Sequence, residues 1–187
     1  MKTKLVKDLM VLISGYATVS QEATLYEAIT ALEEAQKKFD PSRYRHRAIL
    51  IYDEDHKIIG KVSHLDILRA LEPKYKKIGD TVSLSRFGFS PHFLKTMQDQ
   101  LRLWDKPMND ICKKASRLKV KTFMYTPSEG EFVDENASLD EAINQFIMGH
   151  HQSLLVTRNK AIIGILRLTD VFNEVCQAIK TCEIQTE

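Results

Sequence analysis

The sequence predicts an α+β protein in which two β-α-β-β-α repeats pack as a pseudo-twofold pair, with a helical hairpin inserted between them. Three observations predict this class. One stretch of sequence occurs twice, apolar residues change between helical and strand spacing within each copy, and the middle of the chain matches neither copy. We therefore divide the chain into a first repeat at 1–71, an insert at 72–118 and a second repeat at 119–187.

The duplication runs from the start of each repeat to its last helix. Residues 6–29 align without a gap with residues 120–143, and both stretches end in Glu-Ala-Ile. Further along, a histidine, an Ile-Ile-Gly triplet and an aspartate follow in the same order in both copies, at His46, Ile58–Gly60 and Asp66, and again at His151, Ile162–Gly164 and Asp170. So many matches in one order indicate an internal repeat.

Each repeat is predicted to open with a short extended segment and a capped helix. The extended segments are expected at 18–19 and 132–133, and apolar residues then recur at helical spacing from Leu25 and from Leu139. A capping box, in which a hydroxyl and a carboxylate three residues apart bond each other's backbone N–H, is predicted before both helices: Thr24 with Glu27, and Ser138 with Glu141.

A β-hairpin and a second helix complete each repeat. Aliphatic runs joined by tight polar turns predict hairpins of 48–52 with 57–62 and of 153–157 with 161–166, and the closing helices are expected at 65–71 and 168–179. One unit of about 60 residues buries too little surface to be stable alone. We therefore expect the two units to stack sheet on sheet and to share a core.

The insert is predicted to form a helical hairpin. Ser90-Pro91 is typical of a helix start, and an apolar stripe runs from Phe93 to Trp104; a second helix is expected from Pro107, with a stripe that ends at Leu118. We expect both stripes to dock on the repeats or on each other, with a subunit interface as the alternative. The basic stretch 101–121 is interpreted as a solvated face, and a surface for an acidic partner is its alternative.

Composition and motifs argue against several classes of function. The net charge of +2 does not by itself indicate nucleic-acid binding, and the apolar runs are shorter than the ~18 residues of a membrane span. No secretory signal is visible and three cysteines cannot all pair, so we expect reduced thiols in a cytoplasmic protein. Because catalytic and glycine-rich phosphate motifs are absent, we expect no enzyme activity and no required cofactor. His150-His151 is not expected to bind metal, since neighbouring side chains on a strand point oppositely.

The duplicated pattern resembles the CBS domain. The resemblance rests on an alanine-rich first helix, the Ile-Ile-Gly turn and a Gly-x-x-Ser-x-x-Asp series before the last helix, and it covers residues 5–71 and 119–180. Two such units are similar to a CBS pair, or Bateman module. The resemblance implies a regulatory module that binds an adenosyl compound (AMP, ADP, ATP or S-adenosylmethionine) between the repeats, forms a flat homodimer, and regulates an effector protein that the sequence does not identify.

The resemblance also implies which residues bind the ligand. Gly60–Asp66 matches the family series in full, with Asp66 expected on the ribose and Ser63 facing the phosphate, whereas in the second repeat Asp170 is kept and Arg167 replaces the serine. The adenine pocket maps onto the first extended segment of each repeat: Ile13, Ser14 and Ala17 in one, and Pro127, Ser128 and Glu131 in the other.

The same residues also have a purely structural interpretation. Ser63 precedes a predicted helix, where serine is a common N-cap and where Asp66 suits the positive end of the helix dipole. Free N–H groups at a helix start can equally bind phosphate, and a carboxylate one turn in can accept both ribose hydroxyls. We favour binding, and expect Asp66→Ala to weaken adenosine nucleotides. For Arg167, a fork aimed at a phosphate and a solvent-exposed side chain with Thr169 as the cap both stay open.

Further basic residues near the hairpins are candidates for phosphate contacts. Lys61, His46 and His151 belong to this set, whereas Arg43 and Arg45 are interpreted as a surface patch. Two other functions stay open. One is an interaction scaffold with empty clefts that works through the helical insert. The other, ranked third, is nucleic-acid binding through residues 101–121, which would weaken steeply with salt.

Overall fold

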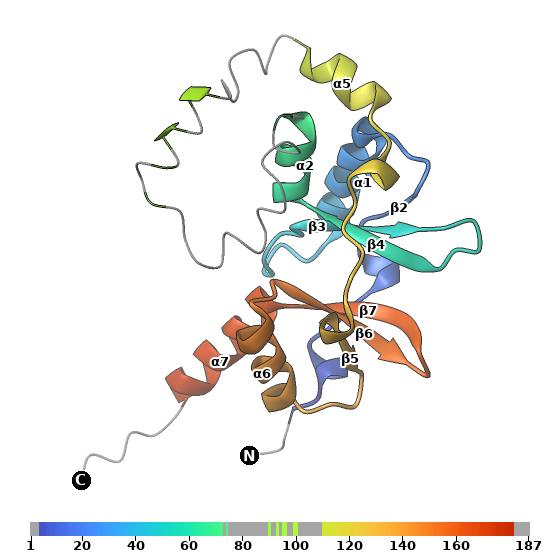
Figure 1. Cartoon of the computed structure of the whole chain (residues 1–187). Helices are drawn as coiled ribbons and strands as arrows, with labels where there is room; N and C mark the ends of the chain where they lie inside the picture. The colour runs from blue at the N-terminus through green and yellow to red at the C-terminus, as the bar shows by residue number, and fades with distance from the viewer. Residues whose placement is uncertain are drawn as a thin grey trace.

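Both repeats have the predicted order of elements in the computed structural model, which describes residues 4–72 and 110–181 and single positions between them at 74, 90, 93, 95–96 and 99–100. The first repeat contains β2 (Thr18–Ser20), α1 (Leu25–Lys38), β3 (Ala48–Tyr52), β4 (Ile58–Ser63) and α2 (His64–Leu71) (Figure 1). The second repeat contains β5 (Phe132–Asp134), α6 (Leu139–Gly149), β6 (Ser153–Arg158), β7 (Ala161–Arg167) and α7 (Leu168–Thr181).

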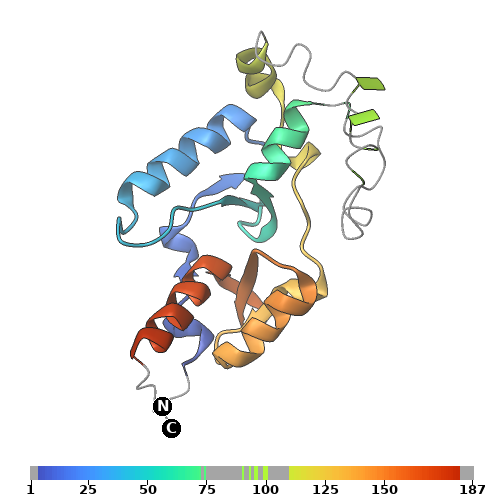
Figure 2. The same ribbon diagram turned by 90° about the vertical axis from the view of Figure 1, so that its left-hand side faces the viewer.

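The two sheets face each other across the middle of the molecule. One has the order β2-β3-β4 and the other β1-β7-β6-β5. The helices α1 and α2 cover the outer side of the first sheet, and α6 and α7 cover the outer side of the second (Figure 2). Leu50 of β3 and Leu155 of β6 are fully buried in one cluster between the sheets, together with Ile165. The expected shared core is therefore present.

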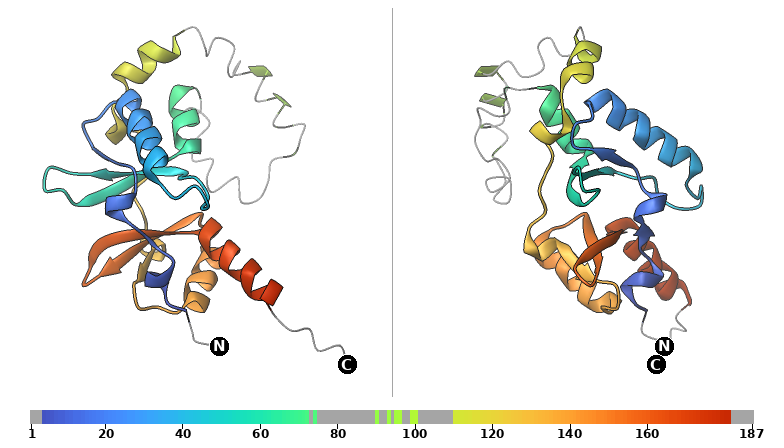
Figure 3. Two further views of the ribbon diagram at one scale, coloured as in Figure 1. Left: turned by 180° about the vertical axis from the view of Figure 1, so that it is seen from behind. Right: turned by 90° about the vertical axis from the view of Figure 1, so that its right-hand side faces the viewer.

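Each repeat also receives the first segment of the other. The short strand β1 (Val11–Leu12) pairs antiparallel with β7, with Val11 opposite Ile165. In the equivalent place of the second repeat, Tyr125 pairs with Lys61 of β4 through two backbone hydrogen bonds of 2.9 Å. We call these two first segments the crossing segments, and they run on opposite sides of the pair (Figure 3). The one that enters the second repeat contains the short 3-10 helices η1 (Val6–Asp8) and η2 (Ile13–Gly15). The one that enters the first repeat contains η4 (Val120–Thr122) and η5 (Glu129–Glu131).

The exchange carries apolar side chains into the core of the other repeat. Val6 is fully buried beside Val133 and Phe146 of the second repeat, and Val120 is fully buried beside Ile49 of the first. Burying a valine side chain contributes about 1.5–3 kcal/mol. The first segments therefore stabilise the pair rather than the repeat to which they belong in sequence.

Gly60 and Gly164 lie at the two crossing points. A Cβ atom on Gly164 would lie 2.7 Å from the carbonyl oxygen of Val11, and one on Gly60 would lie 3.0 Å from that of Tyr125 and 2.9 Å from the sulfur of Met124. Glycine inside a strand often marks a close approach of another backbone. The repeated Ile-Ile-Gly triplet thus has a packing reason that does not involve a ligand.

The predicted capping boxes are formed to different extents. At α1 both bonds are present, since Glu27 N–H donates to Thr24 Oγ1 (3.2 Å) and Thr24 N–H donates to Glu27 Oε2 (2.6 Å). At α6 only the bond from Glu141 N–H to Ser138 Oγ (3.2 Å) is formed, and the exposed Glu141 side chain does not return it. The prediction of a full box at Ser138 is therefore wrong.

The described part of the insert includes α5 (Ile111–Arg117), which packs on the first repeat. Ala115 lies in a cluster with Leu25 of α1 and Leu71 of α2, and Lys114 Nζ donates to the Leu71 carbonyl at 3.1 Å. Phe93 N–H donates to Ser90 Oγ (3.1 Å), as expected of a capped helix start. Trp104, positions 101–109 of the basic stretch 101–121, and the helical hairpin as a whole fall outside the described residues. None of the helices in the described part of the chain is long and apolar enough to cross a membrane.

Candidate functional site

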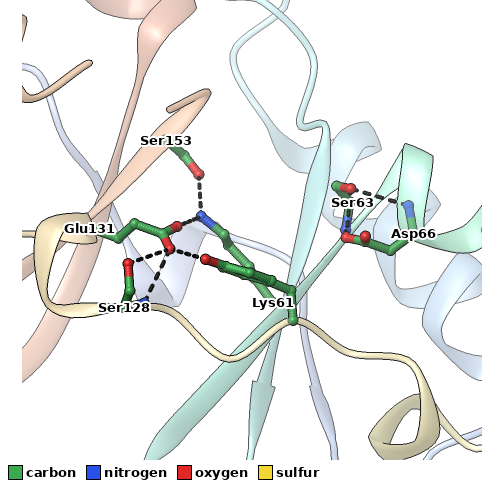
Figure 4. A network of polar contacts seen from close by, with 7 residues as sticks. Lys61, Ser63, Asp66, Ser128, Glu131 and Ser153 are labelled. Carbon is green, nitrogen blue, oxygen red and sulfur yellow. Dashed lines mark hydrogen bonds and ion pairs between the residues drawn. The ribbon is translucent and has the colours of Figure 1, made fainter. Parts of the chain in front are cut away.

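The complete series Gly60–Asp66 ends in a helix cap. Ser63 is the last residue of β4, and its Oγ accepts the N–H of Asp66 at 3.2 Å (Figure 4). Asp66 Oδ2 in turn accepts from the Ser63 N–H (2.8 Å) and hydroxyl (2.6 Å), whereas Oδ1 lies 3.9 Å from the Arg69 guanidinium. Ser63 and Asp66 therefore cap the helix α2, as the structural interpretation of their spacing expected, and Asp66 Oδ1 takes no part in this cap.

A buried polar network lies beside this cap and joins the two repeats. Lys61 Nζ, from β4, lies 2.5 Å from Glu131 Oε2 and 3.4 Å from Ser153 Oγ, and Glu131 Oε1 accepts from the Tyr125 hydroxyl (2.5 Å) and the Ser128 N–H (3.1 Å) (Figure 4). Burial raises the pKa of Glu131, but the bonds from Lys61 and Tyr125 outweigh it and hold that pKa below its usual 4.5. We call Ser63, Asp66, Lys61, Tyr125 and Glu131 the Asp66 cluster.

The second series ends in an ion pair instead of a cap. Arg167 Nε and Nη2 donate to Asp170 Oδ2 (2.5 Å) and Oδ1 (2.6 Å), and Arg167 Nη1 donates to the Tyr44 carbonyl (2.7 Å) and to His46 Nδ1 (3.3 Å). Arg43 Nη2 reaches Asp170 Oδ2 from the first repeat at 3.0 Å. We call Asp170, Arg167, Arg43, His46 and Tyr16 the Asp170 cluster.

Two expectations about arginines need correction. The solvent-exposed alternative for Arg167 is wrong, because its side chain is 5% exposed and its fork fits the carboxylate one helical turn away. The surface interpretation of Arg43 is also wrong, because its guanidinium turns inward to Asp170 and donates to the Leu9 carbonyl at 3.1 Å. Arg45, two residues on, is exposed.

His46 is a buried, uncharged residue of the Asp170 cluster. It is 2% exposed, and its ring lies 4.3 Å from that of Tyr16 and 4.2 Å from that of Phe39. Because Nδ1 faces the donor Arg167, the proton of the neutral imidazole is assigned to Nε2. Burial, and then the charge of Arg167, lowers the pKa of His46 from 6.5 to about 4, and burial raises the pKa of Tyr16 to about 12.

Two cavities adjoin the Asp170 cluster. The larger, of about 590 Å³, lies between the repeats and is lined by Asp8 and Leu9 of the crossing segment, by 41–44 after α1, and by Asp170, Asn173 and Glu174 of α7. The smaller, of about 430 Å³, is lined by Ser14, Ala17 and Phe39 among others. Both volumes fall in the range of small-molecule sites.

The remaining predicted residues lie in different parts of the pair. Ile13 packs in the core between the sheets, Pro127 is half-buried, and Ser128 joins the Lys61 network. His151 is half-buried and lies over Gly149, where a Cβ atom would be 1.9 Å from its Nε2. Among the described residues, no three His, Cys, Asp or Glu side chains are grouped so that they could hold a metal ion.

The sequence interpretation missed the contributions of Tyr125 and Phe39 and misplaced Arg43. All three depend on the crossing segments or on the loop between α1 and β3. The one available signal was that loop itself, where the first repeat carries extra residues around 38–45.

Comparisons with known proteins agree with the fold. The family model described as CBS domain matches residues 6–73 and 120–176. A CBS domain-containing protein from Bacillus anthracis has a TM-score of 0.60 at 16% identity, over 93% of this chain and 94% of that one. A protein from Mathanocaldococcus jannaschii has a TM-score of 0.56 at 17% identity; the match covers 93% of this chain but 60% of that one.

Two similar structures contain nucleotides. CBSX2, solved in complex with AMP, has a TM-score of 0.57 at 18% identity, over 92% of this chain and 97% of that one. The CBS domain of a bacterial CNNM/CorC family Mg²⁺ transporter, solved in complex with ATP, has a TM-score of 0.57 at 15% identity, over 92% and 87%. No curated protein sequence matches the chain.

Proposed function

The chain belongs to the CBS domain family and carries two copies of the domain, and from this premise we propose that it is a regulatory module that senses an adenine nucleotide. The observation that carries the proposal is the cavity of about 590 Å³ between the repeats, into which Asp170 faces. Since both repeats line this cavity, a ligand there can favour one arrangement of the repeats over another, which regulation requires.

The chemistry of the Asp170 cluster supports an adenosyl ligand. A carboxylate near a helix start can accept the hydroxyls of a ribose, as acidic residues do in other nucleotide-binding folds. Arg43, which also contacts Asp170, is 32% exposed and can give way. Two proteins of similar fold were solved with AMP and with ATP. Asp66 offers a second carboxylate through its Oδ1, beside the Lys61–Glu131 pair.

A ligand panel tests the proposal. AMP, ADP, ATP and S-adenosylmethionine are added to the full chain, and the free energy of unfolding is measured; a ligand at ~100 times its dissociation constant should add about 2.7 kcal/mol. Calorimetric titration of Asp170→Asn should then show at least about tenfold weaker binding, and the matched Asp66→Asn a smaller loss. No stabilisation by any member of the panel, or wild-type affinity in Asp170→Asn, would rule the proposal out and favour an interaction scaffold.

The module is proposed to act without catalysis, in the cytoplasm, on a separate effector protein. The unpaired thiols of Cys112 and Cys176 suit a reducing compartment. Because the module is proposed to act without catalysis, incubation of the purified chain with ATP should leave the nucleotide intact. Release of ADP or AMP would contradict this part of the proposal.

We also propose that two chains associate through the second repeat. The helices α6 and α7 pack on each other and carry four large apolar residues that are each 60–75% exposed: Ile147, Met148, Phe172 and Ile179. Such patches are typical of interaction sites. Sedimentation of the wild type should show a dimer that Phe172→Asp dissociates, whereas Tyr26→Asp on α1, equally exposed, should leave it intact.

A further inference from the structure

The larger cavity has a single basic residue among its lining residues. Asp8, Asp170 and Glu174 contribute three carboxylates, and Arg43 contributes the one guanidinium. All three carboxylates already have partners: Asp170 binds Arg167 and Arg43, Glu174 pairs with Lys4, and Asp8 Oδ2 accepts the Leu5 N–H at 3.0 Å. An anionic group that enters this cavity therefore finds its cationic partner in Arg43.

Arg167, for which a phosphate contact was one of two open interpretations, is not free to make that contact. Its guanidinium bonds both oxygens of Asp170, the Tyr44 carbonyl and His46, and its side chain is 5% exposed. Lys61 is held by Glu131 and does not line the cavity. If Lys61 turned to a ligand, the buried Glu131 would lose its counter-charge, and if Arg167 did so, the buried Asp170 would keep only the single contact with Arg43; both changes are costly.

Arg43 is held less firmly. One contact joins it to Asp170 Oδ2 (3.0 Å), one hydrogen bond joins it to the Leu9 carbonyl (3.1 Å), and its guanidinium lies 5.3 Å from the centre of the Phe39 ring. When Arg43 leaves Asp170, that carboxylate keeps its bidentate bond with Arg167. The exchange therefore strands no buried charge.

From these contacts we infer that Arg43 determines phosphate specificity. A ribose that binds Asp170 displaces the Arg43 guanidinium, which stays within the cavity and pairs with the phosphate of the same ligand. The inference rests on the proposed function and assigns the ligand to phosphorylated adenosines rather than to the bare nucleoside. Arg43 lies in the loop that is longer in the first repeat, so this device has no counterpart in the second repeat.

The test compares AMP with adenosine on the full chain. Calorimetric titrations use the wild type, Arg43→Gln, Arg43→Lys and the control Arg45→Gln, which removes the same charge from an exposed position of the same loop. The wild type should prefer AMP by about tenfold or more, because a charge-assisted hydrogen bond is lost with the phosphate. Arg43→Gln should remove this preference. It should bind adenosine at least as tightly as the wild type does, since Arg43 no longer competes with the ribose for Asp170. Arg43→Lys should keep part of the preference, and Arg45→Gln all of it.

The outcomes separate this inference from the proposal beneath it. If Arg43→Gln keeps the wild-type ratio of the two affinities, or if Arg45→Gln loses as much of it, Arg43 does not recognise the phosphate. Ribose binding by Asp170 is then decided separately by the Asp170→Asn variant. If neither compound binds the wild type, the proposed function and this inference both fall. Thermal unfolding without ligand verifies that each variant is folded, and Arg43→Lys carries the test if the glutamine variant is not.

Discussion

The Asp66 and Asp170 clusters occupy equivalent places in the two repeats but hold their carboxylates in different ways. Asp66 sits in a helix cap with Ser63, and the bond between the repeats is made separately by Lys61 and Glu131. Asp170 is itself the bond between the repeats, through Arg43, and is neutralised from within by Arg167. Where the first series has a serine and a helix cap, the second has an arginine and an ion pair within the repeat, and the loop that carries Arg43 adds the ion pair between the repeats.

This difference shows that a series need not be complete to border a cavity. The complete series at 60–66 is satisfied by its own backbone, whereas the altered series at 164–170 borders the larger cavity. Capping and ribose binding use the same atoms of a carboxylate, so sequence spacing serves either role.

The largest difference in the free energy of unfolding is expected when the two aspartates are replaced one at a time. Asp170→Ala should destabilise the protein by about 3–5 kcal/mol, because it leaves the buried Arg167 without a counter-charge. Asp66→Ala removes only the carboxylate half of the capping box, because Ser63 still caps the helix, and should cost about 1 kcal/mol or less. Urea unfolding at neutral pH measures both. Equal costs would mean that the two clusters do not differ in the way described.

Acid should affect the two clusters in separate ranges of pH. The pKa of His46 is about 4 in the folded state against 6.5, so the unfolded state binds the extra proton between these values and stability falls as the pH drops from 6.5 to 4, by about 3 kcal/mol in all. Glu131 has a lowered pKa, so its contribution is complete above 4.5 and is lost only as the pH falls further, through its folded value.

Unfolding free energies at a series of pH values check this order. His46→Asn, whose amide oxygen can still accept from Arg167, should flatten the loss between pH 6.5 and 4, whereas Glu131→Gln should leave that range unchanged. An unaltered slope in His46→Asn would show that another group causes the first loss.

The smallest expected difference between the two repeats lies at the two crossing points. Gly164→Ala should cost about 1–3 kcal/mol, because the new methyl group meets the Val11 carbonyl at 2.7 Å and backbone must move. Gly60→Ala should cost less, since its nearest neighbour is the flexible Met124 side chain at 2.9 Å. Denaturant midpoints of the two variants measure the difference, and a greater loss for Gly60→Ala would reverse our ranking.

The helices and hairpins were predictable because their cause is local. Apolar spacing from Leu25 and Leu139 and the β-branched runs of the hairpins depend only on neighbours in sequence, and the structure confirms them. The crossing strand β1 has two residues, too few for any periodicity, so its pairing with β7 could not be predicted. The contact of Arg43 follows from the fold of the α1–β3 loop, and that of Glu131 follows from the segment that pairs with Lys61 through Tyr125; neither is marked by a sequence period.

The crossing of the first segments has a consequence for synthesis on the ribosome. Val11 finds its partner Ile165 only when the second repeat has emerged, roughly 10–30 s later at the usual speed of translation. Until then the nascent first repeat presents Val6 and Val11 to solvent and an unpaired edge at β4. Lys61 on that edge is the kind of charged residue that discourages aggregation of a waiting strand, so the lysine that later ties the repeats together can protect the chain while it is still being made.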